Sequence, residues 1–278
     1  MITTHARVPE GWGIRGTDEF ARFPAGERHV RDLAPETESP CYVVVRGADA
    51  NDYISAAMWI DLQHRKGHKV TAVVPYLPGA RQDRGRPFGA AVYAGLINAM
   101  KADRVAAFDP HSAVMPQMID NLVVVDSTRA VRRAVTNGAG DTTYTGVISP
   151  DAGALERAGK VAQALHVPLY RASKRRDFAT GALSGFDCEA LPPGGRYLVV
   201  DDICDGGGTF LGLAEATGLP AAQLGLWVSH GVFSGRADRL GLAFGEIITT
   251  DSHPGHCRED VAARIVPVLP HMISEILQ

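Results

Sequence analysis

The stretch YLVVDDICDGGGT occupies residues 197–209 and combines an apolar run with acidic residues and a glycine-rich turn. Its first four residues are typical of a buried strand. The consecutive glycines allow backbone N–H groups to close on a phosphate, and a helix beginning near the final threonine would direct its positive end at the same anion. Because carboxylates beside a phosphate would otherwise repel it, sugar hydroxyls or a metal ion are their expected partners. The stretch therefore predicts a phosphate and sugar site, with a plain turn before a helix as the alternative.

Strands and helices alternate along the rest of the chain. Short apolar runs suited to buried strands occur at Val43–Val45, Val70–Val74, Val105–Phe108, Leu122–Val125, Gly146–Ser149, Val167–Tyr170, Tyr197–Val200, Leu224–Val228 and Glu246–Thr249. Helical length and spacing occur at Tyr53–His64, Ala90–Met100, Ala152–Leu165 and Thr209–Thr217. The polar, glycine-rich segment Thr136–Thr143 is the expected linker. The pattern predicts an α/β fold with two domains, residues 1–141 and 142–278, each a mainly parallel sheet flanked by helices.

Composition indicates a folded globular protein. The 278 residues are 45% hydrophobic and 21% charged, with a formal net charge of -3. The chain has no long basic run, so nucleic acid is not an expected partner. No apolar stretch reaches the ~20 residues that span a bilayer, and the N-terminus lacks a secretion signal pattern. The four cysteines have no CxxC spacing and predict neither a zinc site nor a disulfide scaffold. We expect a cytoplasmic enzyme with no membrane partner.

Several motifs together resemble one enzyme family. The 197–209 stretch resembles the phosphoribosyl-diphosphate binding loop of type I phosphoribosyltransferases, and VPYLPGARQDR at residues 74–84 resembles the ATP-site segment of ribose-phosphate diphosphokinases. Further matches follow in the family's order at Phe23–Glu27, Asn51–Asp52, Phe108–His111, Ser149–Gly153, Lys174–Arg176 and Ser229–Phe233. Ordinary phosphoribosyltransferases lack the ATP-site segment. The resemblance covers roughly residues 20 to 255 and favours the diphosphokinases, the enzymes that make phosphoribosyl diphosphate.

The resemblance implies a fold, a reaction and its partners. It implies two phosphoribosyltransferase-like domains, of which the first binds ATP and the second the ribose phosphate. The implied reaction transfers the diphosphoryl group of Mg-ATP to the anomeric hydroxyl of ribose 5-phosphate and releases AMP. Mg²⁺ is the implied cofactor, ATP and a ribose 5-phosphate compound are the implied substrates, and a homo-oligomer is the expected assembly. The ribose-phosphate residues are expected to be Asp201, Asp202, Asp205, Gly206, Gly207, Gly208 and Thr209.

The ATP site is expected in the first domain. Arg81 offers a planar fork to phosphate, and the amide of Gln82 can both donate to and accept from a purine or a hydroxyl. A solvated turn is the alternative for this segment, and an inert loop histidine is the alternative for His111. By resemblance, the ATP-binding residues are Arg81, Gln82, Asp83, Phe23, Glu27 and His111.

Metal ligands and catalytic residues are expected from three segments. The resemblance makes His111 and Asp151 contacts of the metal and its nucleotide or diphosphate, although Asp151 could instead cap the following helix. Lys174 and Arg176 match a lysine and an arginine of the family's catalytic loop, where positive charge would stabilise the reacting phosphates. His111 is expected to assist catalysis as well. A solvated charge run is the alternative for Lys174 and Arg176. His230 is expected to be structural or to contact site residues without contacting the substrate.

Departures from the family pattern keep other functions open. Only 22 residues precede Phe23, fewer than the family usually has, which predicts a shortened N-terminal part. Ala25 stands where the family has aspartate, and Gly206 stands where it generally has threonine. The space opened at Gly206 makes ADP-ribose an alternative acceptor. A phosphoribosyltransferase is a further alternative, against which Arg81–Asp83 and His111 argue. A noncatalytic regulatory homologue is another, against which the retained His111, Asp151, Lys174, Arg176 and the acidic pair argue.

Overall fold

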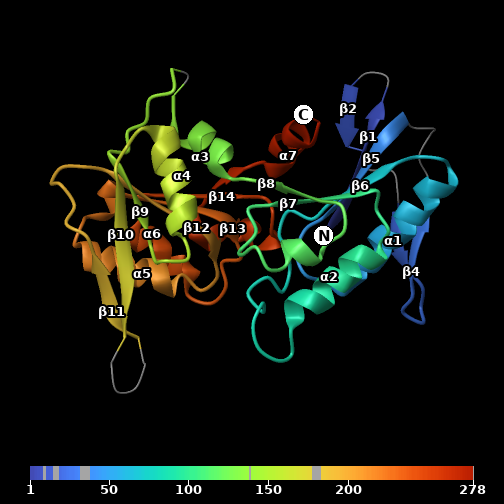
Figure 1. Ribbon diagram of the computed structural model, residues 1–278, viewed down its shortest axis with the longest axis horizontal. Helices are drawn as coiled ribbons and strands as arrows, with labels where there is room; N and C mark the ends of the chain where they lie inside the picture. Colours follow the sequence, from blue (N-terminus) through green and yellow to red (C-terminus); the bar gives the residue numbers. More distant parts are fainter. Residues whose placement is uncertain (9–10, 15–18, 32–37, 138, 177–182, 278) are drawn as a thin grey trace. The chain divides into compact units, whose positions relative to one another are not determined.

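The computed structural model describes the chain except residues 9–10, 15–18, 32–37, 138, 177–182 and 278, and gives the backbone alone for residues 6–8, 11–14, 38–39, 174–176 and 183–184. The fold divides into two compact units (Figure 1). Unit 1 comprises Met1–Val125 and Met272–Gln278, and unit 2 comprises Asp126–His271. Each unit contains its own sheet and its own hydrophobic core, as expected for an α/β chain of this length.

Unit 1 is built on a six-stranded sheet in the order β2-β1-β5-β6-β7-β8. Strands β5 to β8 are parallel, whereas β1 pairs antiparallel with both of its neighbours. A separate antiparallel hairpin is formed by β3 and β4. The elements are β1 (Ile2–Val8), β2 (Gly11–Ile14), β3 (Glu19–Arg22), β4 (Arg28–Arg31), β5 (Glu38–Val45), α1 (Ala50–Arg65), β6 (Val70–Val73), α2 (Gly89–Ala99), β7 (Arg104–Phe108), a 3₁₀ turn (Pro116–Met118) and β8 (Leu122–Val125).

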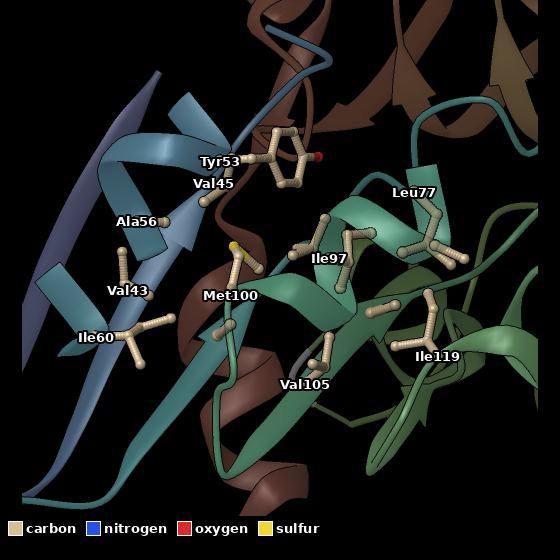
Figure 2. Packing of buried hydrophobic residues seen from close by; sticks show 14 of the residues in the cluster. Val43, Val45, Tyr53, Ala56, Ile60, Leu77, Ile97, Met100, Val105 and Ile119 are labelled. Atoms are coloured by element: carbon tan, nitrogen blue, oxygen red, sulfur yellow. The ribbon is translucent and has the colours of Figure 1, made fainter. Parts of the chain in front are cut away.

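The core of unit 1 lies between the sheet and helices α1 and α2. Figure 2 shows Val43 and Val45 of β5 near Tyr53, Ala56 and Ile60 of α1, all of them fully buried. Burying each large apolar side chain contributes about 1.5–3 kcal/mol to folding before entropy is counted. Helix α1 begins where the Asp49 side chain accepts a hydrogen bond from the backbone N–H of Asn51. This rigid core fixes the carboxyl ends of β6 and β7, which carry the expected ATP segments.

Unit 2 is built on a seven-stranded sheet in the order β11-β10-β9-β12-β13-β14-β15, parallel except for β11. Every residue of β13 is buried, as expected for a central strand covered on both faces. The elements are α3 (Thr128–Val135), β9 (Gly146–Ser149), α4 (Leu155–Leu165), β10 (Leu169–Arg176), β11 (Leu183–Cys188), β12 (Tyr197–Cys204), α5 (Gly208–Thr217), β13 (Leu224–Gly231), α6 (Leu240–Ala243), β14 (Glu246–Thr250) and β15 (Arg264–Val266), with 3₁₀ turns at Ala221–Gln223, Ala237–Arg239, Pro254–Cys257 and Glu259–Val261. Helix α7 (Val268–Ile276) begins in unit 2, and its residues from Met272 onward belong to unit 1.

The predicted α/β fold with mainly parallel sheets is confirmed, and a strand or helix lies at each expected position. The division into units differs from the boundary expected at residues 141 and 142. Helix α3 belongs to unit 2, where it packs against α4. The segment expected to be a linker, residues 136–143, lies inside unit 2. An isolated backbone bridge joins Thr136 to Thr142 within it. The chain also returns to unit 1 after residue 271.

In the described part of the chain, no helix is both long enough and apolar enough to cross a membrane.

Candidate active site

The glycine-rich turn joins the carboxyl end of β12 to the first turn of α5. Gly207 is the N-cap residue of α5 and has φ of 79°, a left-handed conformation that favours glycine. A Cβ at this position would also lie 3.2 Å from Leu240. Because the cap residue has no side chain, the first N–H groups of α5 are not satisfied by a capping side chain. The backbone is thus arranged to accept an anion.

The two flanking glycines leave open space. A Cβ built on Gly206 has only the Ser234 Oγ nearby among the described atoms, at 3.9 Å, which is an ordinary contact. A Cβ on Gly208 has no described atom within 4 Å. The turn therefore requires glycine at position 207 on steric grounds, whereas positions 206 and 208 leave room for a ligand or for a side chain.

Asp201 and Asp202 lie in the carboxyl half of β12, beside an arginine of α4. The Arg157 Nη1 lies 3.9 Å from the Asp201 Oδ1 and 3.7 Å from the Asp202 Oδ1. The Asp201 Oδ1 also accepts a hydrogen bond from the backbone N–H of Asp202. Burial raises the pKa of the Asp201 carboxyl well above its usual range, and the charge of Asp202 raises it further, while Arg157 acts in the opposite direction. In the free protein it is therefore unfavourable for both carboxyl groups of the pair to be ionised. Hydroxyl groups that donate hydrogen bonds to the carboxylates would stabilise their charges.

Asp205 is tied to the loop that follows β13. The Ser234 Oγ donates to the Asp205 Oδ1, and the Ser234 N–H donates to the Asp205 carbonyl at 3.1 Å. Arg258 holds this loop from its other side, because its Nη1 donates to the carbonyls of Phe233 at 2.7 Å and Gly235 at 2.9 Å. Asp205, the first residue of the glycine turn, is thus oriented by the loop at the carboxyl end of β13.

Cys204 lies directly beneath the turn and is fully buried. Burial raises the pKa of its thiol to about 12, and the nearby carboxylates of Asp201 and Asp205 contribute in the same direction. The thiol is therefore protonated at neutral pH and packs as an apolar group in the core of unit 2.

Asp151 lies between β9 and α4. Its Oδ1 accepts hydrogen bonds from the N–H groups of Gly153 at 3.0 Å and Ala154 at 3.2 Å, and its carbonyl accepts one from the Ser149 Oγ at 2.8 Å. These bonds orient the carboxylate at the carboxyl edge of the sheet and close a turn before α4. The N-cap residue of α4 is Ala154, so Asp151 does not cap this helix. The same hydrogen bonds are compatible with a role in which the other carboxylate oxygen meets a cation.

Lys174 and Arg176 lie on β10, beyond the part of this strand that pairs with β9. Pairing with β9 covers Leu169–Arg171, and pairing with β11 continues from Ala172 to Arg176. The side chains of Lys174 and Arg176 lie outside the described part of the chain. Their backbone places both positions on a two-stranded arm at the carboxyl edge of the sheet.

The expected ATP segments of unit 1 meet at the carboxyl ends of β6 and β7. The backbone N–H of Phe108 donates to the Pro75 carbonyl at 3.1 Å, so the two loops leave the sheet side by side. The Ser112 Oγ then donates to the Asp83 Oδ2 at 2.7 Å. This bond joins the Arg81–Asp83 segment to the loop that carries His111.

Gln82 and its neighbours are held by α2. The Gln82 carbonyl accepts from the N–H of Ala90 at 3.2 Å, and its side chain lies directly on Gly89, where a Cβ would overlap it. Arg81, Gln82 and His111 are exposed, whereas Asp83 is mostly buried. The loop thus presents its polar groups to solvent from a rigid base.

Phe23 and Glu27 lie at the turn of the β3–β4 hairpin, which packs against α1. The Phe23 N–H donates to the Glu27 carbonyl at 2.9 Å, and the Phe23 ring lies 5.1 Å from the His29 ring. Phe23 is 49% exposed. These two predicted ATP residues therefore occupy a different element from Arg81–Asp83, at a solvent-exposed turn.

In the segments that the structure describes, no cluster of at least three His, Cys, Asp or Glu side chains could hold a metal ion by itself. Mg²⁺ commonly takes one or two protein carboxylates and completes its shell with substrate phosphates and water. An oriented carboxylate at Asp151 fits such a site. His111 is in unit 1 and Asp151 is in unit 2, so their predicted joint contact with one metal complex stays a prediction.

Sequence reasoning missed four side chains that orient the site. Arg157 approaches the acidic pair, Ser112 holds Asp83, and Ser234 with Arg258 holds the start of the glycine turn. Each contact joins segments that are far apart in the sequence, and no local pattern signals it. His230, expected to be structural, is buried in β13, where its Nδ1 lies 2.7 Å from the Ser252 Oγ.

Comparisons with known proteins agree with this arrangement. The family model "Phosphoribosyl transferase domain" matches residues 126–218, which include Asp151, β10, β12 and the glycine turn. The solved phosphoribosylpyrophosphate synthetase from Mycobacterium smegmatis superposes with a TM-score of 0.72 at 25% identity, covering 94% of this chain and 89% of that one.

Two curated relatives extend the match over most of the chain. The ribose-phosphate pyrophosphokinase of Maricaulis maris is 33% identical over 245 residues, 83% of this chain and 77% of that protein. That of Pyrococcus abyssi is 30% identical over 244 residues, 85% of this chain and 84% of that protein. Because the similarity covers both units and most of each relative, the chain belongs to the ribose-phosphate pyrophosphokinase family.

Proposed function

We propose that this protein is a ribose-phosphate diphosphokinase, which transfers the β,γ-diphosphoryl group of Mg-ATP to the anomeric hydroxyl of ribose 5-phosphate. The acceptor oxygen attacks the β-phosphorus, the bond from that phosphorus to the α-phosphate oxygen breaks, and AMP leaves. The hydroxyl proton is released, and the second product is phosphoribosyl diphosphate. Phosphoryl transfer depends mainly on positioning and charge stabilisation, and residues of each unit would supply these.

The glycine turn is the proposed site of the 5-phosphate. The first N–H groups of α5 and the backbone of Gly206–Gly208 would surround the anion, with Thr209 adding a hydroxyl donor. Asp201 and Asp202 would accept hydrogen bonds from the ribose hydroxyls, with Asp205 held nearby by Ser234. Ribose hydroxyls suit this pair because they donate to carboxylates without adding negative charge.

The loops that follow β6 and β7 are the proposed ATP site. Arg81 would bind a phosphate of the nucleotide, and Gln82 and Asp83 would bind its polar groups from the base formed by α2 and Ser112. Phe23 and Glu27 would contribute from the exposed hairpin turn. His111 would contact the metal-bound nucleotide.

Positive charge over the reacting phosphates is assigned to the β10–β11 arm. Lys174 and Arg176 would donate to oxygens of the diphosphoryl group as charge develops there. Mg²⁺, with Asp151 as its proposed carboxylate ligand, would supply further charge neutralisation when bound.

One observation carries the proposal most strongly. The glycine turn joins β12, which holds the carboxylate pair, to the N-terminus of α5, which no side chain caps, in a chain that also retains the Arg81–Asp83 segment. A phosphoribosyltransferase needs only the glycine turn with its carboxylate pair. The Arg81–Asp83 segment supports an ATP-dependent reaction.

The test is AMP release from Mg-ATP with product mass, using ribose 5-phosphate and ADP-ribose in parallel. Equal amounts of AMP and phosphoribosyl diphosphate are expected from ribose 5-phosphate. Nucleotide formation from phosphoribosyl diphosphate and a free base, without ATP use, would instead identify a phosphoribosyltransferase. ATP binding with no AMP from either acceptor would identify a regulatory homologue.

ADP-ribose is included because of the room beside Gly206, where a side chain would meet only Ser234 among the described atoms. Product from ADP-ribose alone would make this glycine the first specificity residue to examine. Gly206→Thr is then the informative variant, because its backbone conformation accepts a side chain without strain. A loss of ADP-ribose turnover with retained ribose 5-phosphate turnover would identify the open space as the cause.

A further inference from the structure

The β10–β11 arm has little support from the sheet. Strand β10 pairs with β9 only at Leu169–Arg171. From Ala172 to Arg176, the strand partner that the structure describes is β11 alone. An isolated pair of strands is marginally stable in water and needs packing against another element to hold one position. The arm that carries the proposed catalytic positions Lys174 and Arg176 therefore depends on contacts outside the sheet.

One aromatic residue of the arm supplies such a contact. Phe186 of β11 is the register partner of Lys174. Its partly buried ring packs against the core of unit 2 and lies on Gly212, in the third position after Thr209 on α5. Figure 1 shows β10 and β11 running side by side with α5 next to them. The arm thus rests on the helix whose first turn follows the glycine turn.

Gly212 makes this close approach possible. A Cβ built on Gly212 would overlap two ring carbons of Phe186, at 2.3 and 2.5 Å, and would lie 3.3 Å from a third, so any other residue would push the ring away. Glycine in the middle of a helix is unfavourable, because alanine at an unstrained helical position stabilises the chain. The conformation at Gly212 is ordinary helix, since no positive φ is found there. Glycine at this position therefore allows the contact with Phe186 and is not required by the backbone conformation.

We propose that Phe186, seated on Gly212, is the positioning residue that sets Lys174 and Arg176 relative to the ribose-phosphate turn. The inference rests on the proposed function, because it concerns the turnover of that site. Phe186 itself touches no substrate in this proposal. Its role is to fix the distance between the arm and α5, and small displacements of groups that stabilise a transition state cost large factors in rate.

The first test is Phe186→Leu, which keeps an apolar side chain and leaves α5 unchanged. We expect kcat to fall about tenfold or more, while the KM values for ribose 5-phosphate and ATP stay within about twofold. Gly212→Ala should also lower kcat and leave both KM values unchanged, because the added methyl group would push the Phe186 ring away from α5. Combining the two substitutions should restore part of kcat, because leucine leaves room for the added methyl group.

Gly241→Ala on α6 is the matched control. It replaces a helical glycine of the same unit that has no described atom within 4 Å of a built Cβ, and it should leave kcat unchanged. Thermal melting of each variant separates lost activity from lost folding. Wild-type kcat in both Phe186→Leu and Gly212→Ala would overturn the inference, and so would a rise in the KM for ribose 5-phosphate alone. Failure of the wild type to release AMP would instead refute the proposed function.

Discussion

The two units form their candidate ligand-binding positions by different means. In unit 2 the proposed phosphate position is formed by backbone, with Gly207 in a left-handed conformation and α5 starting without a capping side chain. In unit 1 the proposed nucleotide loops are held by side-chain contacts. Asp83 accepts a hydrogen bond from Ser112, and the Gln82 side chain packs on Gly89. Apart from proline, no substitution removes a backbone N–H group, whereas any side chain can be removed. Unit 2 should therefore be sensitive to changes of conformation, and unit 1 to the loss of individual polar groups.

The largest effect is expected from Lys174→Ala in the unit 2 arm. Removing a donor that stabilises transition-state charge costs roughly 3 kcal/mol, so kcat should fall on the order of a hundredfold. Steady-state kinetics with both substrates measures it, alongside Lys66→Ala at the end of α1 as a control. Near-normal turnover would remove Lys174 from the mechanism.

The variant Asp201→Asn tests two separate roles of the acidic pair, in binding ribose 5-phosphate and in the stability of the fold. Hydrogen bonds to charged groups contribute about 1.5–3 kcal/mol, so kcat/KM for ribose 5-phosphate should fall tenfold or more. Because burial raises the pKa of Asp201 in the folded protein, its favourable contribution is complete below the pKa of the unfolded chain and is lost as pH rises through the folded value.

The Asn variant should consequently unfold at higher denaturant concentration than the wild type at pH 8, and the difference should shrink toward pH 4. Chemical denaturation across this range measures both trends. A variant less stable than the wild type at pH 8 would show that the ion pair with Arg157 outweighs the repulsion between the carboxylates.

Gly207→Ala and Gly208→Ala test whether the turn acts through its conformation. The first forces a side chain into a left-handed conformation against Leu240, at a cost of about 1–3 kcal/mol, and should raise the KM for ribose 5-phosphate. The second adds a methyl group in open space and should have a smaller effect on stability. Equal melting temperatures for the two variants would contradict the assignment of strain to position 207.

Ser112→Ala should have the smallest effect of the series. It removes one hydrogen bond to the mostly buried Asp83 carboxylate, worth about 1–2 kcal/mol. We expect a several-fold rise in the KM for ATP and an unchanged KM for ribose 5-phosphate. Equal increases in both constants would mean that the loop supports the whole site and not the nucleotide alone.

Local sequence patterns were enough to predict most of the fold. Short apolar runs such as Tyr197–Val200 became buried parallel strands, because a strand covered on both faces needs continuous apolar residues. The glycine-rich turn was predicted from the conformational freedom that only glycine offers, and Gly207 uses it.

The features that the sequence did not reveal depend on contacts between distant residues. Segment 136–143 has the composition of a linker, yet the Asn137 Oδ1 accepts from the N–H groups of Ala139 at 3.0 Å and Asp141 at 2.9 Å and closes a turn within unit 2. Arg157 beside Asp201 and Phe186 on Gly212 have no local signature either. Such pairs become visible only when the fold brings the elements together.

The return of the chain to unit 1 after residue 271 has a consequence for biosynthesis. Residues Met272–Gln278 complete the first unit, where the Ile276 carbonyl accepts a hydrogen bond from the Arg104 Nη1 at 3.2 Å. On the ribosome these residues are made after the whole of unit 2. The first unit therefore cannot be completed until the second has been synthesised, although most of the first unit is made before it.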